Sequence, residues 1–216
     1  MAKSSRAEEV YGYIKEQFLS GKWKSGDRLN DSLLAEEIGV SRISVREALF
    51  RLMETGVVEK EYWKGYFIKE ITDEMVADVV DTRIALESCA IRNFIREYSP
   101  EDIDQLEKIL ENSRLLLEEG NQTDYLTVDY SFHETIFHNQ HNQYIIRIMD
   151  NMQLVIHFIR YKSMGVGQVF TETGLSSIQW HQRILDAIKA RDEQSAVEQL
   201  TKHLMSHQDE VRAKLK

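Results

Sequence analysis

The chain has 216 residues, of which 42% are hydrophobic and 29% charged, enough for one large or two small domains with a buried core. Its single cysteine, Cys89, excludes an internal disulfide. No apolar run is long enough to span a bilayer and the first ten residues are polar, so we expect no membrane segment, no signal peptide and a cytoplasmic location.

The formal net charge of −9 belongs to the C-terminal part of the chain. Residues 1–70 hold 12 basic and 12 acidic side chains, whereas the remaining 146 residues hold 15 and 24. A neutral part with local basic clusters, joined to an acidic part, favours a DNA-binding domain attached to a body that does not bind DNA. Two-domain enzymes can show the same asymmetry, so charge alone does not decide between them.

Residues 29–53 carry two helical patterns separated by a glycine. Asn30 or Asp31 can cap the first helix, Gly39 ends it and permits a sharp turn, and Ser41 can cap the second helix. Helix, glycine turn and capped helix together predict a helix-turn-helix, whose second helix enters the major groove of DNA.

Arg42 and Arg46 lie one turn apart on the outward face of that second helix, where they could fork onto guanine or hold phosphate. Such a pair alone is more often a solvated helix face. The pattern that follows favours the DNA interpretation, because residues 57–61 and 66–69 predict a two-stranded hairpin wing with Lys64 and Gly65 at its tip. Strand-like alternation is confined to residues 57–71.

From residue 74 onward, apolar residues repeat at helical spacing. Helices are expected over residues 75–98, 101–119, 125–137, 182–190 and 193–202, with a helix start at the Ser99-Pro100 pair and a glycine-containing loop over 164–174. The predicted fold is therefore mainly α: an N-terminal winged helix-turn-helix in residues 1–72 and a C-terminal all-helical antiparallel bundle in residues 73–216.

Four side chains of the bundle suit a metal ion. Asp129 and His133 are four residues apart and share a helix face, while His181 and His203 fall at matching heights on the two helices of a predicted hairpin. Three imidazoles and one carboxylate are typical ligands of a divalent transition metal such as Zn, Ni, Fe, Co or Mn. The competing interpretation is a surface Asp–His pair and ordinary core histidines.

The N-terminal part resembles the GntR family of transcription regulators, through GKWKSGDRL at residues 21–29 and LLAEEIGVSRISVREALFRLMETGVVE at residues 33–59. This family commonly has proline at position 25 and Thr-Pro at positions 43–44, where this chain has Ser25 and Ile43-Ser44. Carried over by position, the resemblance implies DNA contacts by these residues: Ser32, Arg42, Ser44, Arg46, Lys64 and Gly65.

The body resembles the helical, FCD-type effector domain of the FadR-like subfamily, through TRIALE at residues 82–87, DYSFH at 129–133 and WHQRILDAI at 180–188. The resemblance implies a metal held by an Asp and three His, here Asp129, His133, His181 and His203. It also implies a small organic-acid effector, which Arg83 could bind; an ion pair of Arg83 with Glu87 is the commoner arrangement for this spacing.

These features predict a homodimeric DNA-binding transcription regulator, a repressor in the commoner arrangement of this family, and not an enzyme. We expect it to read a palindromic double-stranded operator with an affinity that a small carboxylate bound next to the metal modulates. Two alternatives use the same four residues: a regulator that senses the metal itself, and a helical metalloenzyme with an open metal position.

Overall fold

The computed structural model describes residues 6–19, 22–164 and 167–215 and divides into two compact units. The first unit comprises residues 1–71 and the segment 154–158, and the second comprises residues 72–153 and 159–216. Within the described ranges, none of the helices combines the length and the apolar character that a transmembrane span requires.

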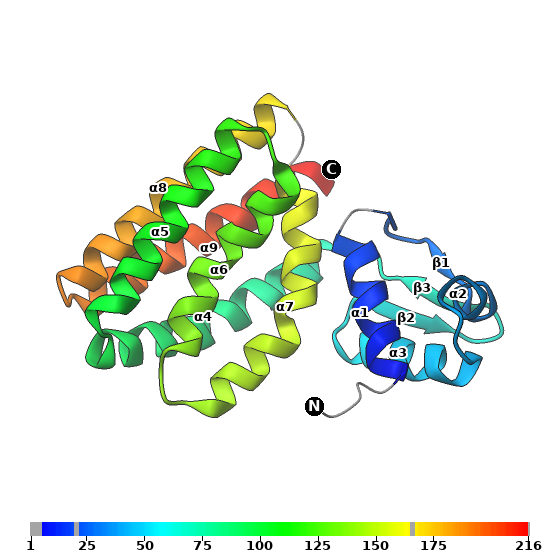
Figure 1. The fold of residues 1–216 in the computed structure, drawn as a ribbon. Coiled ribbons are helices and arrows are strands. Elements are labelled where there is room, and N and C mark those ends of the chain that lie inside the picture. Colours follow the sequence, from blue (N-terminus) through cyan, green and yellow to red (C-terminus); the bar gives the residue numbers. More distant parts are fainter. Residues whose placement is uncertain (1–5, 20–21, 165–166, 216) are drawn as a thin grey trace. The chain divides into compact units, whose positions relative to one another are not determined.

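The described residues between 6 and 71 of the first unit form three helices and a small antiparallel sheet (Figure 1). Its elements are α1 (Arg6–Leu19), β1 (Arg28–Leu29), α2 (Asp31–Ile38), α3 (Arg42–Glu54), β2 (Val58–Glu61) and β3 (Gly65–Ile68). The inward face of α3, which helical spacing predicts, is fully buried at Val45, Ala48, Leu49 and Leu52. Because this face packs into the core, the opposite face of α3 is left to solvent.

The wing has one strand more than the sequence pattern indicates. Strand β3 pairs with β2 as predicted, but also with β1, through the partners Arg28↔Phe67 and Leu29↔Tyr66, so the strand order is β1-β3-β2. The prediction that strand structure is confined to residues 57–71 is therefore wrong. Two residues are too few to show an apolar alternation, and only pairing with β3 makes them a strand.

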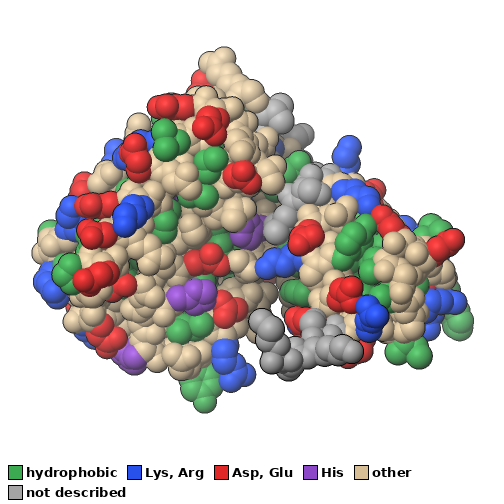
Figure 2. Space-filling view, viewed as in Figure 1, with side chains coloured by type: hydrophobic (Ala, Val, Ile, Leu, Met, Phe, Trp, Pro, Cys, Tyr) green, Lys and Arg blue, Asp and Glu red, His purple; other side chains and the backbone are tan. Residues whose placement is uncertain are grey.

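The second unit is built from helices (Figure 1). Five of them pack against one another: α4 (Asp73–Glu97), α5 (Pro100–Glu118), α6 (Gln122–His138), α8 (Gln168–Lys189) and α9 (Glu193–Leu215). The sixth, α7 (Gln143–Met164), belongs to this unit apart from residues 154–158. Acidic side chains are spread over much of the visible face of the second unit (Figure 2), as the charge of the sequence after residue 70 requires. The predicted class, a winged helix-turn-helix followed by a helical bundle, is confirmed.

The start of α5 follows its local sequence. The Ser99 hydroxyl accepts the backbone N–H of Asp102 at 3.3 Å, and the Asp102 carboxylate accepts the backbone N–H of Ser99 at 2.8 Å. Pro100 occupies the first helical position. This reciprocal capping box satisfies two donors that a helix start otherwise leaves open.

Gly174 does not lie in a loop, contrary to the prediction for residues 164–174. It lies inside α8, which begins at Gln168, whereas residues 165–166 of the predicted loop lie outside the described residues. A Cβ at position 174 would come within 2.5 Å of Leu117 Cδ1, and the Gly174 carbonyl accepts the Tyr125 hydroxyl at 3.0 Å. The glycine thus serves close packing of α8 rather than a turn.

This packing makes the effect of alanine substitution opposite at two helical glycines. Gly12→Ala in α1 adds a methyl group with nothing within 4 Å, so we expect up to ~1 kcal/mol of added stability from helix propensity. Gly174→Ala is expected to lower stability by ~1 kcal/mol, because overpacking outweighs that gain. Urea denaturation followed by circular dichroism measures both, and stabilisation of both variants would contradict the close-packing argument.

Candidate nucleic-acid interface and candidate metal centre

Three local signals shape the helix-turn-helix. The Asn30 side chain accepts two backbone N–H groups of the first turn of α2, at 3.0 and 3.2 Å. Gly39 ends α2 in the left-handed conformation, with φ of 75°, which favours glycine because it lacks a Cβ. The Ser41 hydroxyl then accepts the backbone N–H of Ser44 at 3.2 Å and caps α3. The first half of α3 is thereby presented at a defined angle.

The outward face of α3 carries the predicted contact residues. The side chains of Arg42 and Arg46 are both 56% exposed, and Ile43 between them is 78% exposed. Ser44 is half-buried, with its hydroxyl 3.0 Å from that of Ser41. Of the predicted contacts, Ser32 lies instead at the exposed start of α2.

Asp31 is expected from the sequence as a possible helix cap, but Asn30 performs the capping. The Asp31 carboxylate instead contacts Arg46 Nε at 2.6 Å and Arg42 Nη2 at 3.3 Å. Burial alone would raise the pKa of Asp31, yet the hydrogen bonds and charges of the two arginines outweigh burial and lower it. The spacing of 11 and 15 residues gives no sequence signal for these contacts.

A groove of about 790 Å³ lies in the first unit and includes three of the six predicted DNA contacts, Arg46, Lys64 and Gly65, in its lining. Two further basic residues that the sequence analysis did not select, Arg28 and Lys60, also line it. Two acidic residues, Asp31 and Glu61, line it as well, so basic side chains outnumber acidic ones, which is the electrostatic pattern of a nucleic-acid contact.

The tip of the wing is unusual in its aromatic exposure. Trp63 is 98% exposed at a positive φ of 67°, and the neighbouring Tyr62 is 87% exposed. Lys64 Nζ is held 2.6 Å from Glu61 Oε2, and Gly65 has a φ of 111° that a side chain would disfavour. The hairpin therefore presents a turn whose shape depends on its glycine.

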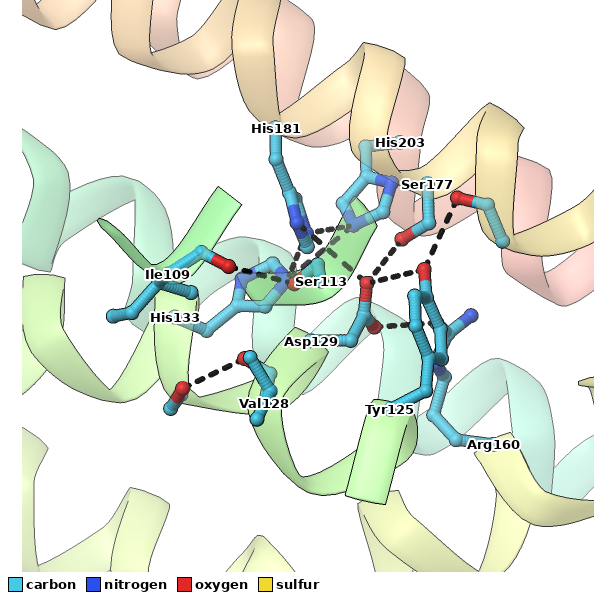
Figure 3. Close-up of polar contacts among 12 residues, drawn as sticks. Ile109, Ser113, Tyr125, Val128, Asp129, His133, Arg160, Ser177, His181 and His203 are labelled. Atoms are coloured by element: carbon cyan, nitrogen blue, oxygen red, sulfur yellow. Dashed lines mark hydrogen bonds and ion pairs between the residues drawn. The ribbon is translucent and has the colours of Figure 1, made fainter. Parts of the chain in front are cut away.

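In the second unit, three histidines from three helices meet in the core (Figure 3). His133 comes from α6, His181 from α8 and His203 from α9, and all three are buried. Nε2 of His181 lies 3.0 Å from Nε2 of each of the other two, whose Nε2 atoms are 3.3 Å apart. The three predicted imidazoles thus converge through the same ring atom.

The fourth predicted ligand, Asp129, lies beside this group with its oxygens engaged elsewhere (Figure 3). Its Oδ1 accepts the hydroxyls of Ser177 at 2.7 Å and Tyr125 at 3.1 Å, and its Oδ2 accepts Arg160 Nη2 at 2.5 Å. Toward the three histidines, its Oδ1 lies 3.6 Å from His181 Nδ1. Burial would raise the pKa of Asp129, but Arg160 and other neighbours hold it well below its usual range.

A buried carboxylate orients one of the three histidines. Glu87 Oε2 lies 2.7 Å from His133 Nδ1, and Glu87 Oε1 accepts Arg83 Nε at 2.6 Å. Burial acts to raise the pKa of Glu87, but its interactions with Arg83 and His133 bring it down to about 2. An ionised carboxylate only accepts, so His133 carries its proton on Nδ1 and directs the Nε2 lone pair at the other histidines.

Arg83, the predicted effector-binding residue, makes the intrahelical ion pair that its spacing from Glu87 favours. Both side chains are 5% exposed. Arg83 Nη2 is buried and has no hydrogen-bond partner within the part of the chain that the structure describes. The guanidinium therefore retains donor capacity inside the bundle.

Burial also sets the protonation of the other two histidines. Desolvation lowers the pKa of His181 to about 3, and it lowers the pKa of His203 well below the usual range. Both rings are neutral at pH 7, which is the form that binds metal ions.

Two further residues buried near this centre are not among the metal-site residues expected from the sequence. His207, one helical turn after His203, has its ring centroid 4.2 Å from that of His203, and its pKa is also lowered well below the usual range by burial. The His-xxx-His spacing could have indicated it. Arg160, which binds Asp129 from α7, had no signal, because 31 residues separate the two.

The residues fit a divalent metal ion. Imidazole nitrogens that each lie ~2.0–2.1 Å from one ion are about 3 Å apart, as the three Nε2 atoms are here. On the far side of the rings, Nδ1 of His181 and Nδ1 of His203 are buried and lack hydrogen-bond partners among the described residues. All three rings direct the same nitrogen at one point rather than at separate hydrogen-bond acceptors, so the donor set suits ligation better than ordinary core packing.

Comparison with known proteins places both parts of the chain. Residues 6–68 match the family described as "Bacterial regulatory proteins, gntR family", and residues 78–206 match the "FCD domain". The chain is 29% identical over 200 residues to an uncharacterized HTH-type transcriptional regulator, YdhC, of Bacillus subtilis, covering 92% of this chain and 86% of that protein.

Two further matches extend over almost the full chain. The gluconate operon transcriptional repressor of Bacillus subtilis is 26% identical over 212 residues, covering 98% of this chain and 87% of that protein. The solved structure of E. coli McbR/YncC superposes with a TM-score of 0.83 at 21% identity, covering 98% of this chain and 99% of that one. The latter similarity shows a shared fold.

Removal of one imidazole tests the metal centre. His181→Ala is expected to lower metal affinity by more than ~100-fold while the helical content persists, because loss of a mere supporting partner already costs ~10–100-fold. Elemental analysis of purified protein and circular dichroism provide the two readouts. His138→Ala, on an exposed histidine paired with Asp150, is the matched control. Unchanged metal content in His181→Ala would rule the site out.

Proposed function

Because the chain belongs to the GntR family of bacterial regulatory proteins and carries an FCD domain, we propose that it is a transcriptional repressor whose operator affinity is modulated by a small carboxylate bound beside a divalent metal. DNA-binding regulation is the activity of this family. The carboxylate, the metal and the release of DNA are the proposed parts. The observation that carries them is the convergence of three buried imidazole Nε2 atoms in the bundle.

Four proposed ligands, Asp129, His133, His181 and His203, would hold the metal. Such an ion supplies Lewis acidity and coordination positions that an oxygen ligand can fill. For Asp129 to take part, its carboxylate must exchange one of its present hydrogen bonds, with Ser177 being the simplest to replace because a hydroxyl can rotate. Two guanidinium groups, those of Arg83 and Arg160, are buried in the same helical unit and are the side chains that would pair with a carboxylate effector.

We propose that the two domains have separate functions: residues 1–72 bind DNA, and residues 73–216 bind the effector and metal. The six residues named from the family pattern would contact the duplex, with Arg42 and Arg46 nearest the base edges. A homodimer presents two such DNA-binding domains, or heads, to a palindromic operator. It thereby gains affinity without further contacts in either head. One head alone offers few phosphate contacts.

Regulation then requires only that the effector bind one arrangement of the two heads better than the other. A ratio of ~100 between its affinities for the two arrangements corresponds to a coupling free energy of about 2.7 kcal/mol, within the usual allosteric range. Effector binding would favour the arrangement that does not match the operator spacing, and the repressor would leave the DNA.

A metal-sensing regulator is the second candidate. The cavity beside Glu87 and His133 measures about 10 Å³, which is room for about one water molecule and not for an organic acid. This observation favours a centre in which occupancy by the ion is itself the signal. The two candidates differ in whether metal alone changes DNA affinity.

The DNA contact is tested with a duplex selected from a random library by the protein itself. Arg46→Ala should weaken binding to that duplex by ~1–3 kcal/mol, because one bidentate base contact is lost. Arg147→Ala, which removes the same charge from an exposed position of the second unit, is the control and should bind normally. Fluorescence anisotropy measures both, and equal affinities for the two variants would contradict the assignment of Arg46.

The metal and effector roles are tested on that same duplex. Protein stripped by a chelator, protein reloaded with Zn²⁺ or Mn²⁺, and reloaded protein with lactate, citrate or gluconate are compared by anisotropy. A carboxylate that weakens binding more than ~10-fold only in the loaded protein supports the proposed modulation. A comparable change on metal loading alone supports the sensor instead, and constant affinity in every condition contradicts both.

A further inference from the structure

The carboxylate of Asp31 is shared by the two arginines of the helix-turn-helix. Asp31 Oδ2 accepts Arg46 Nε at 2.6 Å, and Arg42 Nη2 lies 3.3 Å from both carboxylate oxygens. The Asp31 side chain is only 16% exposed, whereas the two arginine side chains are 56% exposed. The carboxylate therefore lies underneath the guanidinium groups, which keep their outer sides open to solvent.

The Asp31 carboxylate engages only some of the N–H donors of Arg46, and the others are left for DNA. Arg46 is held through Nε, and in the described part of the chain its Nη1 and Nη2 have no protein partner. Guanine is read by two parallel N–H donors of one guanidinium that reach O6 and N7 together. The contact with Asp31 fixes the guanidinium plane of Arg46 while leaving a complete two-donor edge free.

Fixing the side chain lowers the entropic cost of base recognition. A free arginine side chain carries ~2 kcal/mol of rotamer entropy, and part of this is lost whenever it docks on a base. A side chain already held in one rotamer loses less, so recognition of the correct base becomes more favourable.

The same carboxylate reduces binding that does not depend on sequence. Affinity for arbitrary DNA comes from cations that neutralise phosphates and release counterions. Two arginines with one shared carboxylate carry a local net charge of about +1 rather than +2, so this part of α3 attracts phosphates less. Sequence-independent affinity falls, whereas a guanine contact through the free edge is retained.

We propose that Asp31 is the positioning residue that gives this helix-turn-helix its sequence specificity, by holding Arg46 for base reading and weakening the pull of both arginines on phosphate. The proposal rests on α3 contacting DNA as described above. Asp31 itself touches no base, and its effect runs through Arg46 and Arg42. Exposed ion pairs contribute ~0–1 kcal/mol to stability, so the fold does not require this contact.

The experiment measures the ratio of two affinities for each variant. Binding to the library-selected duplex and to a scrambled duplex of the same composition is followed by anisotropy between 50 and 200 mM salt. Asp31→Asn is expected to bind the scrambled duplex ~3–10-fold more tightly, with a salt slope steeper by about 1. Its preference for the selected duplex is expected to fall by ~10-fold or more, while circular dichroism stays unchanged.

Two further variants separate positioning from net charge. Glu36→Gln removes the same charge from the same helix at an exposed position that contacts neither arginine, and should keep the preference of the unmodified protein. Asp31→Glu restores the carboxylate and should recover part of the lost preference. Rescue by the longer acid but not by the amide identifies the ion contact as the cause.

The outcomes distinguish this inference from the function it rests on. If Arg46→Ala loses affinity for the selected duplex but Asp31→Asn keeps the preference, the positioning role is overturned and the DNA contact stands. If Asp31→Asn and Glu36→Gln shift both affinities alike, Asp31 acts only as a charge and the inference again fails. If the unmodified protein does not distinguish the two duplexes, the proposed function fails together with it.

Discussion

Ionisable side chains can be buried in the centre of the second unit only in mutually neutralising groups, and this constraint organises the candidate metal centre. An isolated buried charge costs several kcal/mol, and a partner of opposite charge offsets that cost only with good geometry. Arg83 faces Glu87 and Arg160 faces Asp129, each pair at hydrogen-bonding distance. Because Arg83 keeps Glu87 ionised, Glu87 can dictate which nitrogen of His133 carries the proton.

Several other polar atoms of the second unit are buried without a hydrogen-bond partner. Nδ1 of His181, His203 and His207 is buried without a hydrogen-bond partner among the described residues, as is Glu210 Oε2. Each such atom costs free energy in a closed core, and natural proteins keep few of them. An ion held at the converging Nε2 atoms would leave Nδ1 of His181 and of His203 on the opposite side of the rings, where a ligating histidine ordinarily donates its remaining N–H to a polar partner.

The first unit uses a carboxylate in a comparable way at its surface. Asp31 holds Arg42 and Arg46 from beneath, as Glu87 holds His133 in the bundle. In both cases the acidic side chain itself contacts no proposed ligand. It orients, or selects the tautomer of, a side chain that is proposed to contact one. The difference is solvent: the arginine pair is half exposed and contributes little to stability, whereas the buried pair is required for its surroundings to be satisfied.

Local chemistry was readable from the chain alone. The caps at Asn30, Ser41 and Ser99, the turn at Gly39 and the helical spacing of the bundle depend on residues within a few positions of one another, so the winged helix-turn-helix, the helical body and the histidines suited to a metal were all predictable. Tertiary structure alone decided the contacts between distant segments. It paired β1 with the sheet and placed Gly174 inside a packed helix. It also brought Arg160 into contact with Asp129, and Asp31 into contact with Arg46. Such contacts depend on how helices and strands pack, and they leave no periodic pattern in the sequence.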